Sequence, residues 1–274
     1  DYAALREAGR QPFLTIGPWV HDDIGVMIAG VREAIPWFHA HLRGDRSKLR
    51  EEPVKLFIMG ANEWRNYLDW PPLGSQLQRW NIQPNSGLSP ETPIESEPDH
   101  YRYDPNDPTP AVGGTMMGSN SGPTKNNDLE SRSDVLVYTS AKRDQDLEVI
   151  GPIQAELYVH SSLEYTDFFA RLCDVNPSGK SINICDGILR LTPGKYKVES
   201  DGSIKIIINL WPTAYRFLRT HRLRLQVSSG AHPRFVRNFG TGEPLATATK
   251  LIIAEQSVYH DPSHPSAIIL PVMK

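Results

Sequence analysis

The amino-acid sequence predicts a mainly β fold, a jelly-roll β-sandwich preceded by a short segment of mixed helix and strand. Between residues 134 and 271, eight strand-like runs follow one another without a helical segment, and several alternate apolar with polar side chains. The 23 prolines and 20 glycines are spread along the chain, as frequent turns require. Strands in this number without intervening helices favour a double-sheet architecture, most simply a jelly roll.

The N-terminal elements are predicted to be helix, strand and helix. Residues 1–9 have helical composition, and the short apolar run at 12–16 is typical of a buried strand. Residues 24–42 repeat apolar side chains at helical spacing, so this helix should lay one face on a core. Pro36 interrupts it and predicts a kink or a restart. The charged run at 45–52 indicates a linker.

The sandwich is predicted to occupy residues 53–274 as a second domain after residues 1–52. It begins with a strand-like run at 54–59. Residues 74–133 are mostly turn formers and must wrap a surface or lean on another domain. The later strands are expected at residues 134–139, 153–160, 166–175, 180–191, 203–210, 221–228, 250–254 and 267–271.

Composition and charge exclude several classes of function. The 274-residue chain has a net charge of −3 with both signs interspersed, so it has no basic field for nucleic acid or an anionic membrane. No apolar run approaches the roughly 18 residues of a membrane span. The chain opens without a charged-then-apolar signal segment, which favours the cytoplasm without determining the compartment.

The two cysteines, Cys173 and Cys185, are predicted to be free thiols. They lie in two strand-like runs joined by a turn at 176–179. If Val175 pairs with Lys180, the two sulfurs point to opposite faces of the hairpin and lie too far apart to bond.

The strongest local candidate for chemistry is His21, which ends the string Gly-Pro-Trp-Val-His at residues 17–21. It follows a short buried strand and precedes an amphipathic helix, where α/β-hydrolases place the general base of their triad. An imidazole suits that task because its ordinary pKa lies near neutral pH. The competing interpretation, which spacing alone favours, is that His21 only packs or caps a loop.

No nucleophile accompanies His21 in the sequence. A Gly-x-Ser-x-Gly elbow is absent, and the string at 118–122 has asparagine at its centre. Ser119 and Ser121 are therefore predicted to be loop residues. The two aspartates that follow His21 are poor candidates for the triad acid, because neighbours in sequence rarely fold back to orient a ring.

No metal site and no cofactor are predicted. His260 and His264 have ligand-like spacing, but prolines intervene and no cysteine or acidic cluster joins them. Trp64, Trp70 and Trp80 could line an apolar pocket or cover the sandwich. Covering is favoured for the first two, which leaves Trp80 as the candidate for substrate binding.

Beyond these single motifs, a series of strings runs through nearly the whole chain. In order they are GPWVH at 17–21, WF at 37–38, FIMGANEWR at 57–65, WPP at 70–72, YDPNDP at 103–108, RSDVL at 132–136, TDF at 166–168, CDGILR at 185–190, HRLRLQVSS at 221–229 and PRFVRN at 233–238. In this order and spacing they resemble the C-terminal part of the cocaine esterase and X-Pro dipeptidyl-peptidase family, which also includes α-amino acid ester hydrolases.

The resemblance implies an α/β-hydrolase domain, a helical cap and a C-terminal jelly roll that helps to wall the active site. The family's Gly-Pro-Trp-x-His string carries the triad histidine, which corresponds to His21 and reverses the interpretation made on spacing alone. Residues 1–52 then correspond to the C-terminal remnant of the hydrolase domain, and residues 53–274 to the complete jelly roll. The family's serine and triad aspartate lie upstream of this string, so we expect a longer parent protein.

Two functions compete at this point. In the first, the chain belongs to a serine hydrolase that cleaves a small ester or amide through an acyl-enzyme. His21 is its general base and then acid, and Trp80 contributes to the acyl pocket. The second is a non-catalytic jelly-roll module that binds carbohydrate or a protein partner, which would have no use for the strand, loop and helix around His21. We expect the chain alone to be inactive, because it lacks the nucleophile; esterase or peptidase activity and a homo-oligomer stay open.

Overall fold

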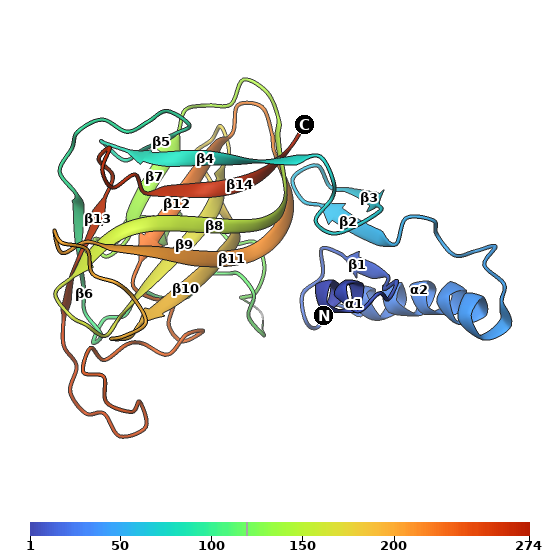
Figure 1. Cartoon of the computed structure of the whole chain (residues 1–274), viewed down its shortest axis with the longest axis horizontal. Helices are drawn as coiled ribbons and strands as arrows, with labels where there is room; N and C mark the ends of the chain where they lie inside the picture. Colours follow the sequence, from blue (N-terminus) through green and yellow to red (C-terminus); the bar gives the residue numbers. More distant parts are fainter. Residues whose placement is uncertain (119) are drawn as a thin grey trace.

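A large β-sandwich and a smaller α/β unit at its side make up the molecule (Figure 1). The structure is a computed structural model that describes residues 1–118 and 120–274. The small unit, which we call the N-terminal unit, contains α1 (Tyr2–Glu7), β1 (Leu14–Ile16), α2 (Ile24–Arg43), β2 (Val54–Ile58) and β3 (Glu63–Tyr67). The predicted mainly β fold is confirmed.

The three strands of the N-terminal unit form a sheet of their own, in the order β1-β2-β3. β1 and β2 are parallel, with Leu14 opposite Val54, and β3 returns antiparallel to β2. Residues 54–59 were predicted to begin the sandwich. Residues 54–58 form β2, which pairs with β1, whereas Met59 exchanges backbone hydrogen bonds with Ala214 and Arg216 of the sandwich. Arg50 makes the connection, because its Nη2 donates to the carbonyls of Leu14 at 3.0 Å and Pro53 at 2.7 Å. The linker is thereby folded back beside β1.

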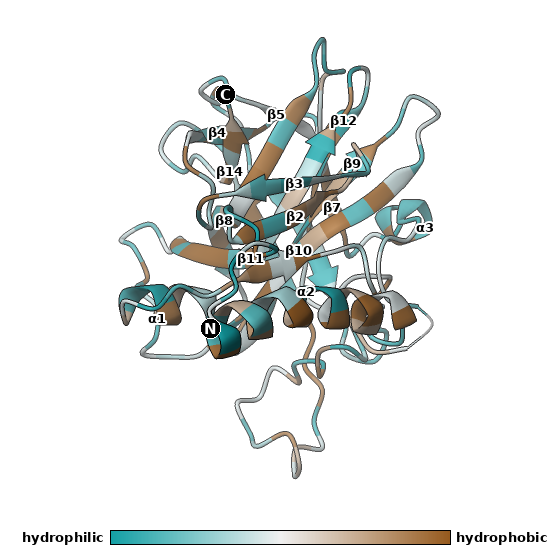
Figure 2. Cartoon of the chain, turned by 90° about the vertical axis from the view of Figure 1, so that its right-hand side faces the viewer, coloured by the Kyte–Doolittle hydropathy of each residue, from teal (hydrophilic) through white to brown (hydrophobic). Residues whose placement is uncertain are grey.

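α2 is one continuous helix of 20 residues that includes Pro36, so the helix does not restart there; a kink, the other alternative, stays a prediction. Asp23 caps its N-terminus by accepting a hydrogen bond from the Gly25 N–H at 2.7 Å, and Gly44 ends it in the left-handed conformation at φ +75°. Only Ala40 is buried, so the helix does not lay its apolar face on a core in this chain. Brown hydrophobic stretches recur along α2 in Figure 2. None of the helices among the described residues is long and apolar enough to cross a membrane.

The described part of the sandwich contains eleven strands and one short helix. They are β4 (Ser75–Gln83), β5 (Gly87–Ser89), β6 (Asp99–Tyr103), α3 (Asn127–Glu130), β7 (Leu136–Ser140), β8 (Leu147–Ser161), β9 (Thr166–Val175), β10 (Ser181–Leu191), β11 (Ile204–Phe217), β12 (Arg222–Ser228), β13 (Ala254–Tyr259) and β14 (Ala267–Met273). Hydrogen bonds join ten of them in the order β10-β9-β12-β7-β5-β4-β14-β8-β13-β6, and β11 pairs with β8. The predicted jelly-roll sandwich is confirmed.

The sandwich core is built by strands that turn alternate side chains inward. On β9, Phe168, Ala170 and Leu172 belong to the apolar core between the layers. The other face of β9 is buried as well: the irregular segment between β6 and β7 binds Arg171, and Phe235 packs against Phe169. Residues 74–133 were predicted to wrap a surface or lean on another domain; part of this segment covers the sheet, and β4, β5, β6 and α3 also lie within the range.

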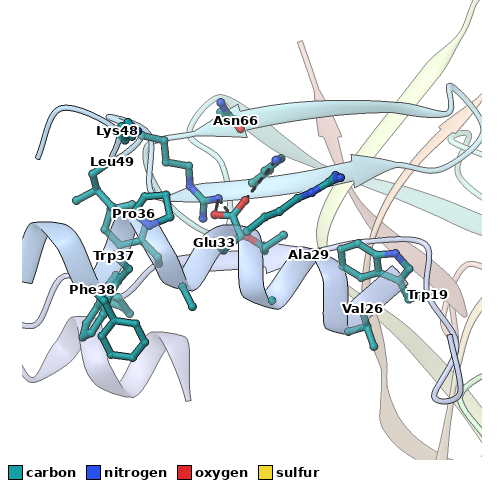
Figure 3. A pocket seen from close by; sticks show the side chains of 18 of the residues that line it. Trp19, Val26, Ala29, Glu33, Pro36, Trp37, Phe38, Lys48, Leu49 and Asn66 are labelled. Carbon is teal, nitrogen blue, oxygen red and sulfur yellow. Dashed lines mark hydrogen bonds and ion pairs between the residues drawn. The ribbon is translucent and has the colours of Figure 1, made fainter. Parts of the chain in front are cut away.

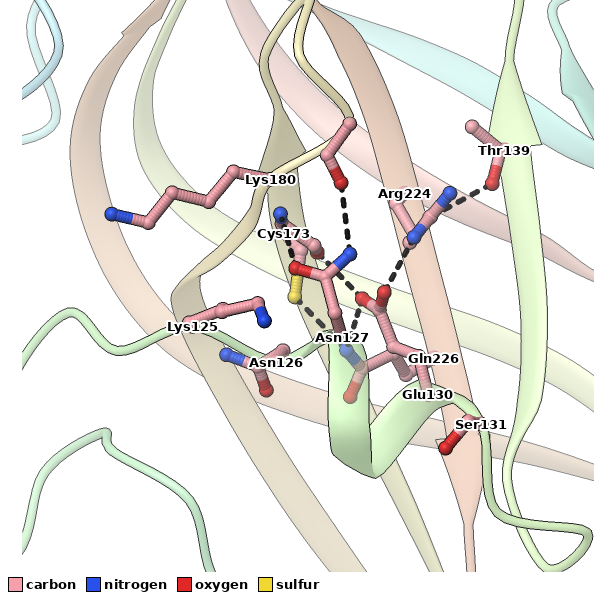
Figure 4. A network of polar contacts seen from close by, with 12 residues as sticks. Lys125, Asn126, Asn127, Glu130, Ser131, Thr139, Cys173, Lys180, Arg224 and Gln226 are labelled. Carbon is pink, nitrogen blue, oxygen red and sulfur yellow. Dashed lines mark hydrogen bonds and ion pairs between the residues drawn. The ribbon is translucent and has the colours of Figure 1, made fainter.

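Glu130 at the end of α3 fixes the covering segment to the outer face of the sheet. It accepts hydrogen bonds from Ser181 Oγ at 2.5 Å and Gln226 Nε2 at 2.8 Å, and it pairs with Arg224 (Figure 4). Its carboxylate therefore connects β10 and β12 to α3. This network offsets part of the desolvation of the charges that it contains.

Both cysteines are free, as predicted, and both are buried. The hairpin register differs from the expectation, because Val175 pairs with Ser181, and a bulge follows Asn183. Burial raises the pKa of the Cys173 thiol to about 12. Burial also raises the pKa of Cys185. Both sulfurs are therefore poor nucleophiles in the folded chain.

Candidate active site

The loop that carries His21 is organised by the Trp19 side chain, which packs against two glycines. A Cβ at Gly17 would lie 2.4 Å from Trp19 Cζ3, and one at Gly25 would lie 2.8 Å from Trp19 Nε1. The indole therefore joins the end of β1 to the first turn of α2. Its outer side contacts Trp64 on β3, with 5.5 Å between the ring centroids. The glycines and both tryptophans thus fix the backbone before and after His21.

His21 lies in an exposed turn between β1 and α2. The turn is closed by a hydrogen bond from the Asp23 N–H to the Val20 carbonyl at 3.1 Å. Asp23 uses its carboxylate as the helix cap, which agrees with the expectation that it does not orient the His21 ring. The structure therefore presents an accessible imidazole on a loop with a fixed backbone.

One loop of the sandwich reaches the His21 turn. A Cβ on Gly122 would lie 3.4 Å from Val20 Cγ1, so the backbone at Gly122 is adjacent to the residue before His21. Ser121 lies in the same loop, where its N–H donates to the Gly118 carbonyl at 3.2 Å in a turn. This is not the strand-to-helix geometry of a nucleophile elbow. Ser119 lies outside the described residues.

Trp80 lies in the core of the sandwich and not beside His21. It is 4% exposed, on β4 opposite Ile268 of β14, and belongs to the apolar core cluster. The Arg143 guanidinium lies 5.3 Å from the centroid of its ring. This position describes a packing residue, and the contact of Trp80 with a substrate stays a prediction.

A cavity of about 710 Å³ separates α2 from the three-stranded sheet (Figure 3). Trp19, Val26 and Ala29 line one end of it, and an ion cluster lies at its centre. In this cluster Glu33 pairs with Arg50 and, at 3.3 Å, with Lys55. These three residues were not predicted as part of a site, because single charges on a helix, a linker and a strand carry no local signal.

The described residues contain no group of three or more metal-ligating side chains close enough to hold an ion. The two histidines with ligand-like spacing have separate partners. His260 contacts Ser96 at 2.9 Å and Asp99 at 3.1 Å. His264 bonds Asp261 at 2.9 Å and Asp201 at 2.7 Å. Each ring therefore joins loops of the sandwich.

The fold and the His21 turn define a β-sandwich domain joined to the histidine-bearing part of an α/β unit. The chain belongs to the family of X-Pro dipeptidyl-peptidase C-terminal non-catalytic domains, whose family model matches residues 48–269. His21 lies before the matched range, in the N-terminal unit.

Two longer relatives extend this similarity to 95% of the chain. Cocaine esterase from Rhodococcus sp. is 33% identical over 297 aligned positions, which cover 51% of that protein. A putative serine esterase from Mycobacterium tuberculosis is 26% identical, with 45% of its length covered. The chain spans about half the length of these relatives.

Solved structures show the same arrangement of the whole chain. An aminopeptidase from a marine-sediment Thaumarchaeota archaeon is 25% identical, with a TM-score of 0.78 over 97% of this chain and 47% of that one. An α-amino acid ester hydrolase superposes with a TM-score of 0.87 at 23% identity, over 99% of this chain and 52% of the other. At 23% identity, the similarity to the α-amino acid ester hydrolase supports the fold alone.

Proposed function

We propose that this chain is the C-terminal part of a serine hydrolase that cleaves an ester or amide through an acyl-enzyme. The observation that carries the proposal is the position of His21, an exposed imidazole on a fixed loop, adjacent to a loop of a sandwich whose relatives are esterases and peptidases. The proposal requires that an N-terminal hydrolase portion supplies the serine and the carboxylic acid. The chain spans about half the length of its relatives, which supports the existence of such a portion.

His21 takes part in both halves of the reaction. As the serine oxygen bonds to the substrate carbonyl carbon, the imidazole accepts the hydroxyl proton. It then protonates the leaving alcohol or amine as the carbon–oxygen or carbon–nitrogen bond breaks. Water repeats the sequence on the acyl-enzyme and releases the acid. Exposure of the ring in this chain fits the role, because both proton partners must approach it.

The N-terminal unit offers two surfaces to the hydrolase portion. β1 has a single neighbour, β2, so its other edge is open to a further strand. α2 leaves large apolar side chains exposed, including Met27, Val31 and Phe38. Helices that cover a parallel sheet bury such a face. We therefore assign the sheet and helices of the N-terminal hydrolase portion as the partner of both surfaces.

The sandwich contributes a wall beside the histidine through residues 112–126, which we call the 112–126 loop. Its contact with Val20 is made by Gly122, at the end of the loop's outer turn. This loop projects from the sandwich toward the N-terminal unit in Figure 1. In this arrangement the sandwich limits the space on one side of His21 without donating a reacting group.

The proposal is tested in the full-length protein with His21→Ala, and with His41→Ala on α2 as the control. We expect His21→Ala to lower kcat/KM for an activated ester by about 10³-fold or more, because the serine loses its proton acceptor. The unfolding transition should be unchanged, since an exposed loop side chain contributes little packing. Activity retained within tenfold in His21→Ala would refute the assignment.

A fluorophosphonate probe separates the two parts of the protein. It should label one serine in the full-length protein and none in the 274-residue chain, as mass spectrometry of both will show. Stoichiometric labelling of a serine within the 274 residues would place the nucleophile here and contradict the proposal.

A further inference from the structure

A buried ion cluster lies under the base of the 112–126 loop. Asp186 on β10 pairs with Arg171 on β9 at 3.0 Å and with Arg234 at 2.7 Å. The side chains of Arg171, Asp186 and Arg234 are 1%, 2% and 7% exposed. Two guanidinium groups share one carboxylate, so their other N–H groups need acceptors if the desolvation is to be offset.

The loop supplies acceptors for Arg171 Nη1 and Arg234 Nη2, while Arg171 Nε has no hydrogen-bond partner among the described residues. Arg171 Nη1 donates to the Val112 carbonyl and to Asn126 Oδ1, both at 2.7 Å. Arg234 Nη2 donates to Thr115 Oγ1 at 2.6 Å. Val112 and Asn126 are the two ends of the loop, so Arg171 connects these ends. Arg234 binds Thr115, close to the first end.

Asn183 of β10 secures the returning side of the loop. Its Oδ1 accepts the Thr124 N–H at 2.8 Å, and its Nδ2 donates to the Gly122 carbonyl at 3.1 Å. Gly114 and Gly122 also exchange backbone hydrogen bonds of 2.8 and 2.9 Å across the loop. The position of Gly122, which contacts Val20, therefore depends on β10 and on the ion cluster.

The glycines at the base allow the charges to approach the backbone this closely. Gly114 has φ +89°, and a Cβ there would lie 2.8 Å from both Arg234 Nη1 and Asp186 Oδ2. Gly113 has φ +61°, and a Cβ there would lie 2.6 Å from the Gly122 carbonyl oxygen. Glycine at positions 113 and 114 therefore leaves space for the charged groups and for the Gly122 carbonyl.

We propose that Arg171, Asp186 and Arg234 are positioning residues that hold the 112–126 loop against the His21 turn. They act through the loop and touch no reacting atom. By fixing Gly122 beside Val20, they set the width of the space next to His21 and so the size of acyl group that the enzyme accepts. This inference rests on the proposed function for its consequence in catalysis, and on the contacts above for the anchoring itself.

The anchoring is tested with Arg234→Met, and Arg190→Met is the matched control. Arg190 pairs with Asp167, which is also buried, and in each variant the aspartate keeps a second partner. We expect Arg234→Met to speed hydrogen–deuterium exchange of the Gly114 and Gly122 amides in the 274-residue chain at least tenfold. Arg190→Met should leave both amides unchanged.

Asp186→Asn is the second variant, because it keeps the shape of the carboxylate and removes only its charge. It should also speed exchange of the two amides. If Arg234→Met and Arg190→Met change exchange equally, or if neither cluster variant changes it, the anchoring role is wrong.

The consequence for selectivity is measured in the full-length protein with p-nitrophenyl acetate and p-nitrophenyl benzoate. The ratio of their kcat/KM values should shift about tenfold in Arg234→Met, stay unchanged in Arg190→Met, and return toward the original value in Arg234→Lys. Faster exchange with an unchanged ratio would overturn the selectivity role. If the unaltered protein hydrolyses neither ester, the proposed function fails, while the exchange data still decide the anchoring.

Discussion

Two elements rich in apolar side chains, β9 in the sandwich and α2 in the N-terminal unit, have opposite surroundings. All ten residues of β9 are buried, on one face by the apolar core and on the other by the segment that Glu130 and Arg171 bind and by the Phe235 ring. α2 has twenty residues, of which one is buried. The sandwich therefore covers both faces of β9 with its own residues, whereas the N-terminal unit presents an apolar face of α2 that its own chain does not cover.

The same contrast holds for the charged groups. In the sandwich, Asp186 and Glu130 are almost excluded from water and each has several partners. In the N-terminal unit, the Glu33 cluster is partly exposed beside a cavity. Buried charges that share several partners favour one arrangement of loops, while an open cluster leaves room for further chain.

The largest expected effect on the free energy of unfolding comes from removing a buried aromatic side chain from the sandwich. Removal of an exposed aromatic side chain from α2 is the comparison. Phe168→Ala should lower the free energy of unfolding of the 274-residue chain by about 3–5 kcal/mol, because the ring is fully buried and leaves a cavity. Phe38→Ala on α2, where the ring is 50% exposed, should change it by no more than about 0.5 kcal/mol. Urea unfolding measures both. Similar losses for the two variants would show that the face of α2 is covered in solution.

A smaller effect is expected from Glu130→Ala. Loss of the carboxylate leaves Arg224 and Gln226 without their shared acceptor in a nearly buried site, so the free energy of unfolding should fall by about 2 kcal/mol. Glu255→Ala is the control, because Glu255 pairs with Arg102 in water and should cost less than about 1 kcal/mol. Equal urea midpoints for the two variants would mean that the covering segment contributes no stability.

Strand periodicity predicted most of the sandwich because its strands bury alternate side chains. β9 has the predicted bounds, and β12 starts one residue after its prediction. β4 was missed because its apolar residues change faces, with Leu77 outward and Trp80 and Ile82 inward, which breaks the period of two. The pairing of β2 with β1 was not predicted, because the two strands lie far apart in the sequence and local periodicity does not determine strand order.

The candidate site was predictable only where it is local. The string that ends in His21 marks a strand-loop-helix, and the glycines on both sides of Trp19 explain why its residue types occur together. The contact of Val20 with Gly122 joins two loops far apart in sequence and has no local signal. The ion cluster that holds Gly122 in place comes from three separate elements, so it emerges only when β9 and β10 are paired.

The smallest expected effect concerns a histidine that joins two sandwich loops. His264 donates to Asp261 and Asp201, and the Tyr259 ring lies beside it. Burial by itself would lower the pKa of His264, but the hydrogen bonds to the two carboxylates outweigh burial and raise it. The pKa of Asp201 is lowered to about 2, chiefly by hydrogen bonds from Ser203, so this carboxylate is charged at neutral pH.

Because the folded pKa of His264 is raised, its contribution to stability is complete below the ordinary histidine value of about 6.5 and is lost as pH rises through the folded pKa. The unaltered chain should therefore have a higher urea midpoint than His264→Gln at pH 5.5, and the gap should narrow as pH rises through the folded pKa of His264. A gap that is constant, or that widens toward pH 9, would mean that His264 contributes by packing between Tyr158 and Tyr259 and not as a charged clamp. The sandwich would then differ from the N-terminal unit in how its loops are packed, and not in how its charges are paired.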